Sequence, residues 1–108
     1  MAGDFVIRAD RRETPLPRDV MEELLARMES EDFEGRLEER RESAALARRL
    51  RAIFQSDAGI FDATESEQQT LGGALRRWLD EVKLPNFPAA AKHLLDALDT
   101  AETDRQGR

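Results

Sequence analysis

The sequence predicts an all-α fold: a small four-helix array or bundle with an extended N-terminal arm and a frayed C-terminal tail. Apolar residues recur at helical spacing over most of the chain, and prolines and glycines separate the periodic segments. The length of 108 residues suits one small domain. We therefore expect one modest core without a large cleft.

Residues 1–16 are expected to form the arm. Phe5, Val6 and Ile7 favour a short extended stretch, and Pro15 and Pro17 favour extended backbone after it. A lone strand of three apolar residues is marginal without an edge to pair with. The stretch is therefore expected to dock on the body of the protein or on a second copy.

The helical domain is expected to span residues 17–99, with helices near 17–30, 32–55, 64–83 and 88–99. Thr64-Glu65-Ser66-Glu67 has the form of a capping box that opens the third helix, and Pro88 suits the first turn of the fourth. Residues 100–108 are polar and are expected to be disordered. The clearest apolar stripes are Val20, Met21, Leu24, Leu25 and Met28 in the first helix and Leu71, Ala74, Leu75, Trp78, Leu79 and Val82 in the third.

Composition narrows the class of protein. The chain has 17 Lys and Arg against 23 Asp and Glu, and this net charge of −6 argues against a general affinity for nucleic acid. It has no cysteine, no signal-peptide pattern and no apolar run of about twenty residues, so we expect a cytoplasmic protein that does not enter a membrane. The strong preference for arginine over lysine suggests the GC-rich genome of a bacterium or its phage.

Three glutamates offer the sharpest catalytic hypothesis. Glu38, Glu39 and Glu42 spell the EExxE signature of all-helical nucleotide pyrophosphohydrolases, whose carboxylates bind magnesium from one helix face. Those enzymes also need an ExxD pair on the next helix, and residues 62–65 show that order reversed. His93 is the only histidine and lacks an acid/base partner. We therefore expect no catalytic residue, no metal site and no cofactor.

Gly72 and Gly73 are unusual inside the third helical pattern, because each costs about 1 kcal/mol relative to alanine in a helix. We favour tight helix packing within the fold or a helix that begins at Gly73, and the alternative is the close approach of a partner backbone or a ligand. Basic clusters occur at residues 48–51 and 76–77, but the fourth helix is not a basic recognition helix. Direct nucleic-acid binding is therefore not expected.

These observations favour a non-enzymatic helical interaction protein, a regulator, adaptor or inhibitor that acts by binding another protein. One alternative is the magnesium-dependent nucleotide pyrophosphohydrolase. Another is an acidic phage-type inhibitor of a nucleic-acid-binding machine, whose acidic residues imitate a phosphate backbone. The candidate partner-binding residues are Phe5, Ile7, Leu37, Arg40, Arg41, Ala44, Gly72, Gly73, Arg76 and Arg77.

A homodimer is also expected. The second helix is longer than its neighbours, and between Leu37 and Leu46 it offers only alanines for burial. Part of it must face solvent or another chain, and Ala44 and Ala45 would permit a close helix crossing. The apolar residues of the arm would add surface to a two-fold contact.

Overall fold

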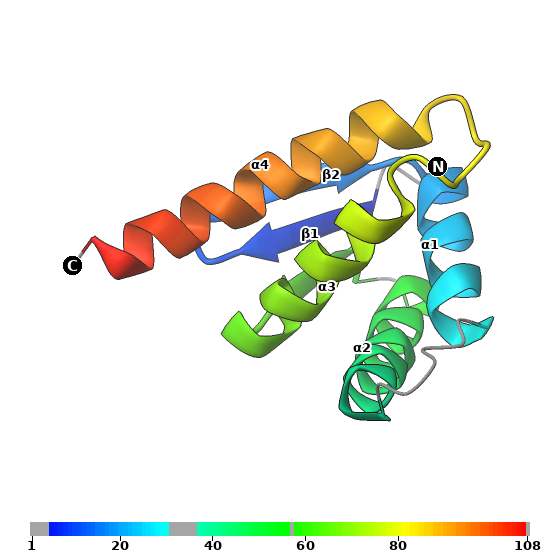
Figure 1. Ribbon diagram of the computed structural model, residues 1–108, viewed down its shortest axis with the longest axis horizontal. Helices are drawn as coiled ribbons and strands as arrows, with labels where there is room; N and C mark the ends of the chain where they lie inside the picture. Colours follow the sequence, from blue (N-terminus) through cyan, green and yellow to red (C-terminus); the bar gives the residue numbers. More distant parts are fainter. Residues whose placement is uncertain (1–4, 31–36, 57, 108) are drawn as a thin grey trace.

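The computed structural model describes residues 5–30, 37–56 and 58–107, without the side chains of residue 30 and residues 37–40. In this part of the chain four helices accompany three strands, so the fold is α/β and the expectation of an all-α bundle is wrong (Figure 1). The elements are β1 (Phe5–Ala9), β2 (Arg12–Leu16), α1 (Arg18–Ser30), α2 (Leu37–Gln55), β3 (Ile60–Ala63), α3 (Glu65–Trp78) and α4 (Phe87–Gln106).

The three strands form one mixed sheet in the order β2-β1-β3. β1 pairs antiparallel with β2 across a turn at Asp10 and Arg11, and parallel with β3, where Ile7 lies opposite Phe61. Asp10 has a φ of 58°, a left-handed conformation that aspartate adopts more readily than most residues. The expected arm is therefore a hairpin that supplies the central strand of the sheet.

One face of the sheet is covered and the other is open. Side chains alternate between the two faces of a strand, and the inward residues Ile7, Leu16 and Phe61 are at most 1 % exposed. Their neighbours Val6 and Ile60 point to the other face and are only half-buried. Figure 1 shows α3 and α4 crossing the same side of the sheet, which makes the molecule a two-layer sandwich.

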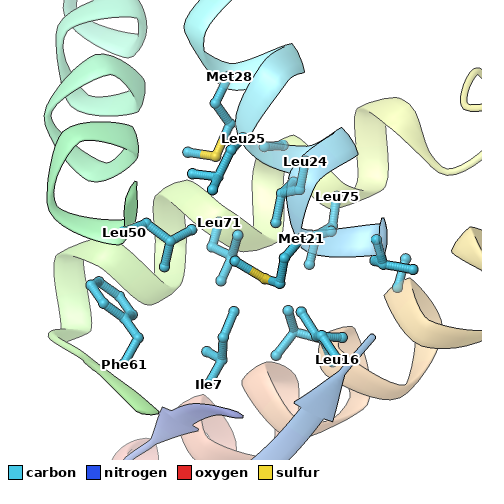
Figure 2. Packing of buried hydrophobic residues seen from close by; sticks show 14 of the residues in the cluster. Ile7, Leu16, Met21, Leu24, Leu25, Met28, Leu50, Phe61, Leu71 and Leu75 are labelled. Carbon is cyan, nitrogen blue, oxygen red and sulfur yellow. The ribbon is translucent and has the colours of Figure 1, made fainter. Parts of the chain in front are cut away.

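The core lies between the covered sheet face and the helices (Figure 2). Met21 and Leu24 of α1, Leu50 of α2 and Leu71 and Leu75 of α3 converge there, and each is at most 1 % exposed. The apolar stripes expected for α1 and α3 thus pack on a sheet as well as on other helices. The hydrophobic effect that holds the helices also holds the hairpin in place.

The capping box at the start of α3 is confirmed. The Glu67 N–H donates to Thr64 Oγ1 at 3.2 Å, and the Thr64 N–H donates to Glu67 Oε1 at 2.9 Å. Arg49 of α2 binds the same carboxylate, with Nε 2.7 Å from Glu67 Oε2, and its guanidinium lies 4.7 Å from the centre of the Phe61 ring. This one arginine joins α2, β3 and α3.

The expected frayed tail is helical as far as residue 106, because polar contacts anchor the end of α4. Arg105 Nη1 donates to Asp10 Oδ2 and to Gln68 Oε1, both at 2.8 Å. Gln68 is 3 % exposed, and its Nε2 donates to the Ala63 carbonyl at 3.1 Å. Ala101, which is 1 % exposed, packs in the core one turn earlier.

The outer edge of β2 is a poor template for another strand. The Val6 N–H donates to the Gly59 carbonyl at 2.9 Å, so the backbone groups of Val6 point toward β3. Pro15 lies opposite Val6 in the antiparallel register and must direct its own backbone away from β1, to the open edge. Since proline has no N–H, that edge lacks a donor at this position.

Candidate functional site

The outward side of α2 is the candidate functional site. Leu46, Leu50 and Phe54 of this helix face the core. On the opposite side, positions spaced by four, three and four residues form one exposed line, because such spacing keeps side chains on one helix face. These positions are Arg41, Ala45, Arg48 and Ala52, and we call them the arginine face.

The two arginines of this face are unpaired. Within the part of the chain that the structure describes, Arg41 and Arg48 form no hydrogen bond or ion pair, whereas their neighbours Arg49 and Arg51 bind carboxylates of α3 and α1. Arg41 and Arg48 are two helical turns apart, a rise of about 10 Å along the axis. In a chain of net charge −6, the two arginines concentrate positive charge that no described carboxylate binds.

Two described carboxylates next to the arginine face, those of Glu42 and Glu29, bind other side chains. Glu42 points toward α3, where its Oε2 accepts a hydrogen bond from Thr70 Oγ1 at 3.5 Å. Glu29 of α1 binds Arg51, whose guanidinium holds the pKa of that carboxyl below its ordinary value. The arginine face therefore combines charge with small alanine side chains, which allow another backbone to come close.

The partner-binding residues that the sequence suggests do not lie on one common surface. Arg41 belongs to the arginine face, and Ala44 is exposed beside it. The side chains of residues 37–40 lie outside the described residues, which leaves the predictions for Leu37 and Arg40 open. Phe5 and Ile7 are 2 % and 0 % exposed, so the chain itself covers them.

The other four candidates lie on α3. Gly72 faces α4 across a small hollow of about 30 Å³, which Leu98, Asp99 and Glu102 also line. Arg76 closes this hollow with an ion pair to Asp99. Gly73 and Arg77 are exposed. These residues therefore form no common surface with Phe5 and Ile7.

A second hollow, of about 370 Å³, lies between the hairpin and α4. Its charged lining comes from Arg11, Arg12 and Glu13 of the hairpin and from Asp96 of α4, and His93, Thr14 and Thr100 also line it. Sequence reasoning misses this hollow, because only the packing of the hairpin under α4 brings the two segments together. Its lining carries charge of both signs, so it favours neither an anion nor a cation.

The magnesium motif cannot be assembled from the described side chains. Those of Glu38 and Glu39 lie outside them, and the remaining acid of the motif, Glu42, binds Thr70. Among the described residues, no three His, Cys, Asp or Glu side chains lie close enough together to hold a metal ion.

The Arg–Ala pattern of α2 could have been found from the sequence. The spacing used to detect apolar stripes also detects the line through Arg41, Ala45, Arg48 and Ala52 when it is applied to charged and small residues. What the sequence does not reveal is which arginines are paired, since Arg49 and Arg51 lie beside Arg48 and have partners on other elements.

Comparisons with known proteins add no assignment to this geometry. The chain shows no significant match to any protein-family model, curated protein or solved structure. None of the helices in the described residues is both long and apolar enough to cross a bilayer.

Proposed function

We propose that this chain is a non-enzymatic interaction protein of the cytoplasm, a regulator, adaptor or inhibitor that acts by binding another protein through the arginine face of α2. The observation that carries the proposal is the pair Arg41 and Arg48, exposed on either side of Ala45 and without an ion-pair partner among the described side chains. Arginine forms strong bidentate contacts with carboxylates, so the partner surface is acidic.

The size and shape of this surface favour a protein over a nucleic acid. Binding to a phosphate backbone draws on many basic groups, whereas the arginine face has two and the chain as a whole is acidic. Ala45 and Ala52 offer a flat strip that suits the side of another helix, because small residues permit helix axes to approach within about 8 Å.

Photo-crosslinking in the cells that express the protein tests the proposal. A photoreactive amino acid placed at Ala45 is expected to give a discrete crosslinked protein product upon irradiation. The same group at Ala89, an exposed alanine of α4, serves as the matched control and is expected to give none. Adding Arg48→Glu to the Ala45 variant should abolish the product.

Two results would contradict the proposal. One is the absence of a discrete protein product from the Ala45 position. The other is an equal product from Ala45 and Ala89, because contact at both positions would be nonspecific.

A further inference from the structure

The outer side of α1 carries the opposite charge at the spacing of the arginine face. Leu24, Leu25 and Met28 of α1 face the core, and the opposite side of the helix is exposed. There, as on α2, an alanine lies between two like charges that are seven residues apart. These residues are Glu22, Ala26 and Glu29, and we call them the acidic face.

The acidic face is accessible and keeps its charge. Glu22 is exposed and forms no ion pair within 4 Å among the described residues, although it lies close enough to Arg51 to help Glu29 raise the pKa of that guanidinium. The Glu29 carboxylate binds Arg51 at 2.6 and 2.7 Å, yet its side chain remains 41 % exposed. That ion pair also links α1 to α2, so the two faces belong to neighbouring helices.

We propose that the arginine face of one copy binds the acidic face of a second copy, forming a two-fold homodimer. The inference rests on the proposed function and names the protein that α2 binds. Two-fold symmetry uses both faces of each copy, because α1 of each chain meets α2 of the other. Each dimer therefore contains the same contact twice.

Antiparallel packing of α1 against α2 is the arrangement we infer. It sets the positive end of one helix dipole near the negative end of the other. Glu22 then faces Arg48 of the second copy, and Glu29 faces Arg41 of the second copy. The alanines between them, Ala26 and Ala45, meet near the point where the helices cross.

Other parts of the surface are less suited to a second copy. The inward-facing apolar residues of the sheet are already covered within the chain, and on the open face Val6 and Ile60 are half-buried. The open edge of β2 lacks a donor at Pro15. A contact made of charges and small side chains forms quickly and weakens as salt screens it. The dimer should therefore dissociate at high ionic strength.

A charge exchange tests this contact. Arg48→Glu and Glu22→Arg each place like charges together in both contacts of a dimer, and each should weaken the dimer about tenfold or more. A mixed dimer contains one chain of each variant. In one of its contacts the native Glu22 meets the native Arg48, and in the other the two substituted side chains meet with their charges exchanged. The mixture should therefore recover a dimer that neither variant forms alone.

The measurement is the mass by sedimentation equilibrium over a range of protein concentrations. Wild-type protein should approach twice the monomer mass of 12.3 kDa, and Arg11→Glu, which reverses an exposed arginine in the hairpin turn, should behave like the wild type. Circular dichroism and the fluorescence of the buried Trp78 confirm that each variant is folded.

Three outcomes would overturn the inference: a wild-type chain that stays monomeric, a dimer that survives Arg48→Glu, and a mixture of variants that fails to associate. Its failure is distinguishable from that of the proposed function. If the chain is a monomer but Ala45 crosslinks to a different protein, the proposed function stands and the second copy is excluded as the partner.

Discussion

At the scale of single residues, Gly72 and Gly73 have no steric reason to be glycine. A Cβ atom at Gly72 would lie 3.5 Å from Arg76 Nη1 and 3.8 Å from Leu98 Cδ1, which are ordinary contact distances. A Cβ atom at Gly73 would meet nothing within 4 Å. Neither residue has a positive φ. The tight packing that the sequence suggested for this pair therefore does not require glycine.

We expect Gly72→Ala and Gly73→Ala each to raise the free energy of unfolding by about 1 kcal/mol, because alanine restricts the unfolded chain and favours the helix. Urea denaturation followed by Trp78 fluorescence measures the change. Gly59→Ala is the control. Gly59 has a φ of 71°, so its substitution should destabilise the protein even though a Cβ atom there meets no neighbour within 4 Å. A loss of stability in either α3 variant would contradict the prediction.

At the scale of elements, the helices were predictable because their signals are local. Apolar spacing located the four helices, but α3 ends at Trp78 rather than near residue 83, and α4 continues past residue 99 to Gln106. The Thr64 capping box marked the start of α3 correctly. The strands were not predictable in the same way. β1 and β3 have only five and four residues, and the two strands pair with each other although they lie about fifty residues apart in the chain. A short apolar run gives no sign of such a partner.

The end of α4 shows a related difficulty. Sequence periodicity looks for large apolar residues and finds none after residue 100. The structure instead holds this turn through Ala101 and the hydrogen bonds from Arg105 to Asp10 and Gln68. A small buried residue and an arginine with distant partners look the same in sequence as a polar tail. The pairing state of Arg41 and Arg48 on the arginine face escapes sequence analysis for the same reason.

The junction of α2, β3 and α3 makes stability depend on pH. Burial by itself raises the pKa of Glu67, but hydrogen bonds from Arg49 and Thr64 outweigh it, so the pKa in the folded state lies below the ordinary value. The unfolded chain therefore binds this proton more readily than the folded chain does. The stabilisation is present above the ordinary glutamate pKa and is lost as the pH falls through the folded value.

We therefore expect the free energy of unfolding to fall upon acidification below about pH 4.5. Glu67→Gln should lower stability at pH 7 by about 1 kcal/mol and remove part of the acid dependence, because the neutral amide retains a cap but loses the ion pair with Arg49. Asp80→Asn, at an exposed acid that forms no ion pair among the described residues, is the control. Urea titrations from pH 3 to pH 7 measure both effects. An unchanged acid dependence in Glu67→Gln would contradict this account.

At the scale of the whole molecule, the hairpin is built into the core. Its inward residues fill the space under α1, α3 and α4, and β1 joins the N-terminal hairpin to the strand that follows α2. The hairpin is therefore part of the single core of the protein. This placement also changes the case for a homodimer. Phe5 and Ile7 of the arm are covered within the chain, and only the half-buried Val6 remains on the open face of the sheet. The charged faces of α1 and α2 are the surface that we propose binds a second copy.

Two adjacent residues of β1 test whether the hairpin packs in the core of its own chain or docks on a second copy. Ile7 is fully buried on the covered face of the sheet, whereas Val6 points to the open face. Ile7→Ala should lower the free energy of unfolding by about 2 to 5 kcal/mol, because it leaves a cavity in the core, and Val6→Ala should cost less than about 1 kcal/mol. If Ile7 instead docked on a second copy, its contribution would grow with protein concentration, because association stabilises by mass action. Urea denaturation at two protein concentrations a hundredfold apart measures the loss of stability in Ile7→Ala. We expect this loss to be the same at both concentrations. A loss that disappears on dilution would show that Ile7 lies at an interface between chains.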